Sequence, residues 1–186
     1  MSPEELALID SGPNPFALQW VQAVVGNRPA EVWRQMAPDY RLSLVQLWLA
    51  HNPEALNDPS AASLDRDELA GCLAAEEPEH VLFRHVARVS LRELRNSFGD
   101  VDISEIAPGT RPRLVGPDLE LVRLFYLPDL ERDDAGNYVF AAGATARALS
   151  VLVNRTAAGW AVAGVGEGLL RPGWPPTFER IVQAND

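Results

Sequence analysis

Apolar residues recur every three to four positions through the first half of the chain, which is typical of amphipathic helices. Asn14 and Pro15 predict the start of the first helix, because asparagine is a common N-cap and proline is common in the first turn. Gly26 ends that helix, and a short second helix follows from Pro29. Residues 38–51 form a third helix that is apolar nearly all round, so we expect other elements on both sides of it.

Residues 53–63 read as a surface loop before a fourth helix. Asp65 and Glu68 have the spacing of a capping box, in which each side chain bonds the other's backbone N–H. The buried side of this helix is predicted to contain Leu69, Cys72 and Leu73. Residues 79–98 have a mixed pattern, and we interpret them as helical.

After Gly99 the pattern changes to short runs of strand-forming residues separated by turns. Strands are predicted at residues 119–127, 137–142, 145–154 and 160–167. The loop at 133–136 would join the first two, and residues 156–159 would form a hairpin between the last two. A tail helix is predicted at residues 177–183.

Helices followed by antiparallel strands indicate an α+β fold, because meandering strands segregate from the helices. The length of 186 residues suits one domain. We therefore expect a flexible lead-in over residues 1–13 and a single domain over residues 14–186.

One family resemblance follows from this order of elements. The tryptophan-bearing helices of residues 16–50, and the segment from Pro112 to Glu120 that leads into long hairpins, resemble the nuclear-transport-factor-2-like superfamily. The resemblance implies a strongly curved antiparallel sheet that wraps around the helices as a cone with a cavity at its open end. That superfamily includes ketosteroid isomerase, scytalone dehydratase and polyketide cyclases, together with members that bind or dimerise without chemistry.

The amino-acid composition excludes several classes of function. The net charge is −10, and all 16 basic residues are arginine. An acidic chain repels phosphate backbones and anionic lipid, so we expect neither nucleic-acid nor membrane binding. The absence of lysine excludes a Walker-type phosphate loop and Schiff-base catalysis. We expect a cytoplasmic protein, and the abundant Ala, Arg, Pro and Gly indicate a GC-rich bacterial source.

Metal and cofactor sites are not indicated. Cys72 is the only cysteine, which excludes an internal disulfide and a cysteine-ligated zinc. His80 and His85 are five residues apart, which does not fit the i, i+4 spacing of a zinc-binding helix. We therefore predict no metal and no cofactor.

The aromatic residues of the first and third helices are the first candidates for a ligand pocket. Trp20, Tyr40 and Trp48 would line the floor of the cone or would simply fill the core. Asp118 and Glu120 are two apart at the start of a strand, so their carboxylates share a face. If that face were the cavity, their repulsion would raise one pKa and create an acid/base pair.

Two arginines interrupt hydrophobic strands, and each would be costly to bury without a partner. Arg123 and Arg147 would pair with Glu120 or Glu167 inside the cone, or would face outward. The pocket residues that we predict are Trp20, Tyr40, Trp48, Glu120 and Arg147.

Catalysis is not supported by the residue pattern. An isomerase of this superfamily needs a general base together with a buried tyrosine and a protonated acid as oxyanion donors. The first helix offers Trp20 on its apolar side and neither tyrosine nor aspartate, so no catalytic residue is assigned.

Three hypotheses for function remain. The first is a non-catalytic protein that binds a small apolar or polyketide-like molecule and forms a homodimer, through strand positions such as Val151 and Val153 if they face outward. The second is an isomerase, dehydratase or cyclase with Glu120 or Tyr40 in acid/base roles. The third is a protein-interaction module that uses the basic helix face made by Arg84, Arg88, Arg92 and Arg95.

Overall fold

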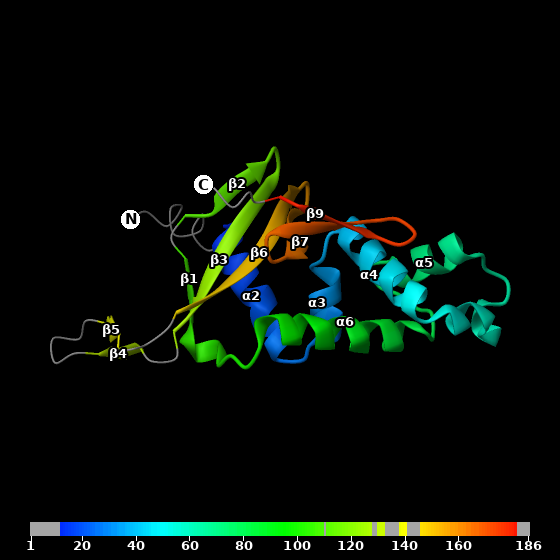
Figure 1. Cartoon of the computed structure of the whole chain (residues 1–186), viewed down its shortest axis with the longest axis horizontal. Helices are drawn as coiled ribbons and strands as arrows, with labels where there is room; N and C mark the ends of the chain where they lie inside the picture. Colours follow the sequence, from blue (N-terminus) through cyan, green and yellow to red (C-terminus); the bar gives the residue numbers. More distant parts are fainter. Residues whose placement is uncertain (1–11, 110, 128–129, 133–137, 141–145, 182–186) are drawn as a thin grey trace.

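The computed structural model describes residues 12–109, 111–127, 130–132, 138–140 and 146–181 (Figure 1). These residues form helices in the first half of the chain and an antiparallel sheet in the second. The predicted α+β class is confirmed. Residues 1–11 of the predicted lead-in, and the loop predicted at 133–136, lie outside the described residues.

Prolines set the starts of the first three described helices. Each of them has proline in its first turn, where a missing N–H costs nothing. The helices are α2 (Pro13–Val25), α3 (Pro29–Arg34) and α4 (Pro38–His51). The N-cap of α2 is Gly12 rather than the predicted Asn14, whose side chain instead donates a hydrogen bond to the carbonyl of Gly109 at 3.3 Å.

The predicted loop after α4 contains two short 3-10 helices, η1 (Pro53–Asn57) and η2 (Pro59–Ala61). Helix α5 (Arg66–Ala74) begins with the predicted capping box between Asp65 and Glu68. Leu69 and Leu73 of α5 are buried as predicted, but Cys72 is exposed, so its predicted burial is wrong. Helix α6 (Phe83–Phe98) follows, and η3 (Ile103–Glu105) leads into the sheet.

The main sheet has its strands in the order β1-β3-β6-β7, and β2 also pairs with β3. Its longest ladder joins β3 to β6, with Leu119 opposite Asn154 and Tyr126 opposite Arg147. Two separate hairpins pair β4 with β5 and β8 with β9. The strands are β1 (Ile106–Pro108), β2 (Arg113–Gly116), β3 (Leu119–Tyr126), β4 (Leu130–Arg132), β5 (Tyr138–Phe140), β6 (Arg147–Thr156), β7 (Gly159–Val165), β8 (Gly168–Arg171) and β9 (Thr177–Arg180).

The last element differs from the prediction. Residues 177–180 form strand β9 rather than a helix, because they pair with β8 along the whole strand from Arg171 opposite Thr177 to Gly168 opposite Arg180. The turn between the two strands is held on the helices. Gly173 N–H donates to Gln46 Oε1 at 2.8 Å, and Trp174 Nε1 donates to Asp67 Oδ1 at 2.6 Å.

The two faces of the sheet have separate apolar clusters, because side chains alternate between faces along each strand. The face that carries Val122, Val151 and Val153 packs on the helices and belongs to the main core. The opposite face forms a smaller cluster with Leu121, Leu152 and Leu169. Val151 and Val153 are fully buried, so the prediction that they face outward and form a dimer surface is wrong.

The link between α3 and α4 covers part of the β7 edge. Val162 N–H donates to the carbonyl of Gln35 at 2.8 Å, and Ala37 N–H donates to the carbonyl of Val162 at 2.7 Å. Met36 thereby forms a parallel bridge with Val162. This pairing fixes the helices to the sheet at residues 35–37. No described helix is long and apolar enough to cross a membrane.

Candidate binding groove along helix α6

Helix α6 carries four arginines on one side. At 3.6 residues per turn, Arg84, Arg88, Arg92 and Arg95 fall within a sector of about 80°. All four are exposed, whereas Val86 and Leu94 on another side of the helix are buried. The amphipathic pattern therefore positions the arginines: burial of the apolar face turns the basic face outward.

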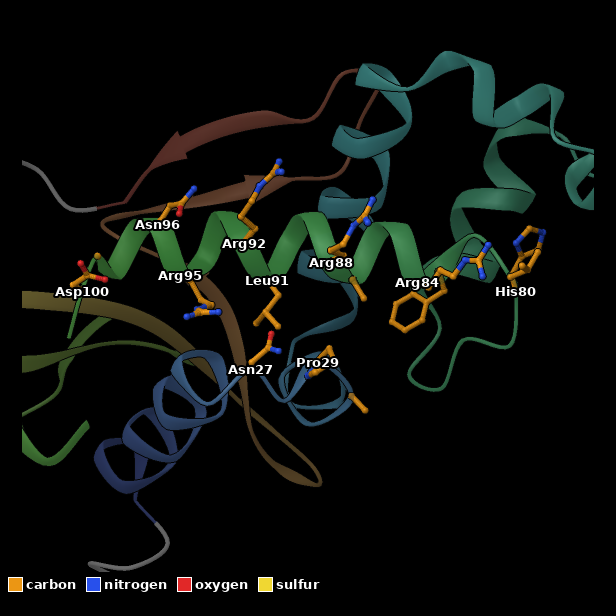
Figure 2. A pocket seen from close by; sticks show the side chains of 15 residues that line it. Asn27, Pro29, His80, Arg84, Arg88, Leu91, Arg92, Arg95, Asn96 and Asp100 are labelled. Carbon is orange, nitrogen blue, oxygen red and sulfur yellow. The ribbon is translucent and has the colours of Figure 1, made fainter. Parts of the chain in front are cut away.

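A groove of about 1030 Å³ runs along this basic face (Figure 2). Its opposite wall contains Asn27 of the turn between α2 and α3, together with Pro29 and Ala30 at the start of α3. Figure 2 shows Arg95 and Leu91 pointing from α6 toward Asn27. Asn27 has φ of 55°, a left-handed conformation that asparagine tolerates, and this turn ends α2 beside the groove.

The floor of the groove is apolar. It contains Phe83, Ala87 and Leu91, and Val81 at one end is 50% exposed. Phe83 is held by an edge-to-face contact with Trp33, with ring centroids 5.0 Å apart. A rigid apolar floor beside a basic rim fits a ligand that has both an apolar and an anionic side.

Two of the four guanidinium groups have a local partner. Arg84 Nε donates to His85 Nε2 at 3.2 Å, and Arg92 pairs with the adjacent Glu93 at 3.2 Å. The Arg92–Glu93 pair is largely exposed and therefore contributes little to stability. Within the described part of the chain, no carboxylate lies within ion-pairing distance of Arg88 or Arg95. Their charges are thus available to an anionic partner.

The end of the groove is defined by Gly99 and Asp100, just after α6. Gly99 has φ of 67°, and a Cβ there would lie 2.8 Å from Arg147 Nη1. Arg147 Nη2 donates to the carbonyl of Asp100 at 3.1 Å, and its guanidinium lies over the Tyr126 ring. Arg147 therefore holds the exit of α6 in place and does not line the groove.

The structure does not bring the predicted pocket residues together. Trp20 and Trp48 lie in the main core, with 0% and 8% of their surfaces exposed. Trp20 Nε1 donates to the carbonyl of Val32 at 3.1 Å, and its ring packs edge-on against Phe98. Tyr40 lines a second, smaller cavity. Glu120 and Arg147 line neither that cavity nor the groove.

The ion pair predicted for the strands forms outside the core. Arg123 Nη2 lies 3.7 Å from Glu167 Oε1, and both side chains are nearly half exposed. The outward-facing alternative therefore holds for Arg123. Asp118 lines the smaller cavity together with Tyr40, whereas Glu120 does not, and the isomerase, dehydratase or cyclase alternative stays a hypothesis.

The histidines have structural contacts. His80 Nε2 lies 3.1 Å from the carbonyl of Ser60, and Leu82 N–H donates to His80 Nδ1 at 3.2 Å. Among the described residues, no group of three or more His, Cys, Asp or Glu side chains could hold a metal ion.

The groove wall was missed by the sequence analysis. Pro29 was interpreted only as a helix start and Asn27 was not singled out, and both lie more than 50 residues before α6 in the chain. Gly26, Asn27 and Pro29 are residue types typical of a turn, but a local turn pattern contains no signal of what the turn would face.

Comparisons with family models, with curated proteins and with solved structures found no match. The resemblance to the nuclear-transport-factor-2-like superfamily, with its cone and cavity, therefore stays a prediction.

Proposed function

We propose that this protein is an interaction module that binds an acidic, partly apolar segment of another protein in the groove along α6. One observation carries the proposal: all four arginines of the basic helix face line the same groove, and two of them have neither a hydrogen-bond nor an ion-pair partner among the described residues. Arginine suits this role because its planar guanidinium bonds carboxylates bidentately.

The spacing of the arginines favours a helical segment. Arg84, Arg88 and Arg92 are separated by one helical turn each, about 6 Å along the axis. Glutamates at i, i+4 and i+8 of a partner helix have the same spacing. A helix laid against α6 would place its carboxylates opposite these arginines and its apolar side over Ala87 and Leu91.

Nucleic acid fits the same groove less well. The arginines are the basic face of a chain whose net charge is −10, which opposes the approach of a long polyanion. The groove floor is apolar, and it offers surface for aliphatic side chains rather than a continuous phosphate track.

The test is fluorescence anisotropy with a labelled 16-residue amphipathic peptide whose glutamates follow the i, i+4, i+8, i+11 pattern. A peptide with glutamine at those positions is the matched ligand control. The double variant Arg88→Glu/Arg95→Glu should lose at least about tenfold in affinity, because it replaces attraction with repulsion. Arg155→Glu changes an exposed arginine of the β6–β7 hairpin and should bind as wild type does.

Near-UV circular dichroism of each variant checks that the core is intact. The proposal is wrong if the glutamate and glutamine peptides bind equally, or if the double variant binds as tightly as the Arg155→Glu control. A single-stranded oligonucleotide that binds more tightly than the glutamate peptide would also overturn it.

A further inference from the structure

A second cavity, which shares no lining residue with the groove along α6, lies where the start of α4 meets the β2–β3 turn and the β8–β9 hairpin. Its volume is about 520 Å³, within the range of small-molecule sites. Most of its wall is apolar and comes from Val115, Leu119, Ala163, Leu169, Leu170 and Ile181. Nothing in the proposed function depends on this cavity.

Tyr40 is the polar side chain that points to a ligand here. It lines the cavity, and only 6% of its surface is exposed. Its hydroxyl makes no hydrogen bond to any described residue. Burial raises the pKa of Tyr40 well above its usual value, so the group stays a neutral hydroxyl that can donate and accept.

The Tyr40 ring is buried, whereas its hydroxyl oxygen retains accessible surface, so a ligand in the cavity can reach it. Asn154 also lines this cavity, and its Oδ1 is buried without a hydrogen-bond partner, which native proteins rarely keep without a reason. Two polar groups without a described partner therefore lie where most of the wall is apolar.

The charged groups around the cavity that have no described ion-pair partner are negative. The carboxylates of Asp39 and Asp118 lie at the exposed rim, and no described cation is within ion-pairing distance of either. Arg171 also lines the cavity, but its Nε is 2.6 Å from Glu179 Oε2, which neutralises it. The rim therefore attracts a cation and repels an anion.

We infer that this cavity binds a small organic cation, with an ammonium group between the Asp39 and Asp118 carboxylates and an apolar body against the Leu119 and Leu169 walls. The Tyr40 hydroxyl accepts a hydrogen bond from the ligand's N–H and thereby gains the partner that it lacks. The site is separate from the α6 groove in position and in charge.

Ligand-observed NMR titrations with the full chain test this inference. The probes are 2-phenylethylamine and 2-cyclohexylethylamine, with 2-phenylethanol as the neutral match and 3-phenylpropanoate as the anionic match. Both amines should bind, the alcohol should bind at least about fivefold more weakly, and the carboxylate should not bind measurably.

Two cavity variants and two control variants locate the binding. Tyr40→Phe keeps the ring and should weaken the amines about fivefold, the effect of one hydrogen bond. Asp39→Asn/Asp118→Asn should weaken them about tenfold or more. Glu54→Gln removes an exposed carboxylate outside the cavity and should leave binding unchanged, as should Arg88→Glu/Arg95→Glu in the α6 groove.

The following outcomes would contradict a cation site in this cavity. Failure of both amines to bind at millimolar concentration overturns it, and so does equal binding of amine, alcohol and carboxylate. Amine binding that survives in both cavity variants would place the ligand elsewhere. Because the Arg88→Glu/Arg95→Glu variant is one of the controls, the test of this cavity is independent of the function proposed for the α6 groove.

Discussion

Replacement of Arg41 by methionine should destabilise the fold by more than any exposed substitution. Arg41 is on α4, and only 6% of its surface is exposed. Its Nε donates to the carbonyl of Ala74, the last residue of α5, and its Nη1 donates to the carbonyl of Met36, each at 2.9 Å. One guanidinium thus donates to a carbonyl at the end of α5 and to a carbonyl in the link between α3 and α4.

The magnitude follows from those two carbonyls. Methionine retains most of the stem but leaves both oxygens without their partner, at roughly 1–3 kcal/mol each. The loss is reduced because a cation no longer has to be desolvated, a cost that also lowers the pKa of Arg41. We expect a net loss of about 3 kcal/mol, which for a chain of this size lowers Tm by roughly 6–12 °C.

Urea unfolding followed by tryptophan fluorescence, together with a thermal melt, measures this loss. Arg34→Met is the matched control, because Arg34 is exposed on α3, and it should stay within about 0.5 kcal/mol of wild type. An Arg41→Met variant as stable as the Arg34→Met control would refute the reasoning that Arg41 joins α4 to α5.

Three further predictions concern single side chains. Asp65→Ala removes the capping box of α5 and should lower the free energy of unfolding by about 1 kcal/mol in urea titrations. Asp65→Asn retains an acceptor and should lower it by less. Equal losses in the two variants would contradict the stabilising role of the cap. Cys72 is exposed, so Ellman's reagent should titrate one thiol in the native chain without denaturant, and a thiol that reacts only after unfolding would show burial. Burial raises the pKa of Tyr40, so the folded chain keeps this hydroxyl protonated at pH values where the unfolded chain loses the proton. The free energy of unfolding should therefore be unaffected below about pH 10 and should fall above it by up to about 1.4 kcal/mol per pH unit. Tyr40→Phe should flatten that decline in urea titrations between pH 9 and 11, a range in which the chain has no lysine to titrate, and an unchanged slope would place the Tyr40 hydroxyl in solvent.

The sequence predicted those elements whose ends are set by local chemistry. Pro38 and Pro53 bracket α4, and the predicted bounds agree with the structure. The capping box of α5 was also predicted, because both of its partners lie within four residues. Residues 177–180 were misread as a helix, since what makes them a strand is a pairing with β8 that a local pattern does not contain.

The candidate site, too, was predicted only in those parts that depend on local sequence. The basic side of α6 follows from helical spacing and was predicted from the positions of its arginines. That this side lines a groove depends on Asn27 and Pro29, which reach it only through the tertiary fold. The sequence left two alternatives for the aromatic residues, because a tryptophan in an apolar stripe packs equally well in a core or in a cavity wall, and Trp20 and Trp48 lie in the core.

The backbone pairing of Val162 with residues 35–37 has a consequence for behaviour at high concentration. An open strand edge is a template onto which another chain can add, and fibrils grow by such additions. At Val162 the donor and the acceptor are already occupied by Gln35 and Ala37, so a second molecule finds no free backbone there. Disruption of the short link between α3 and α4 would therefore expose an aggregation-prone edge as well as loosen the helices.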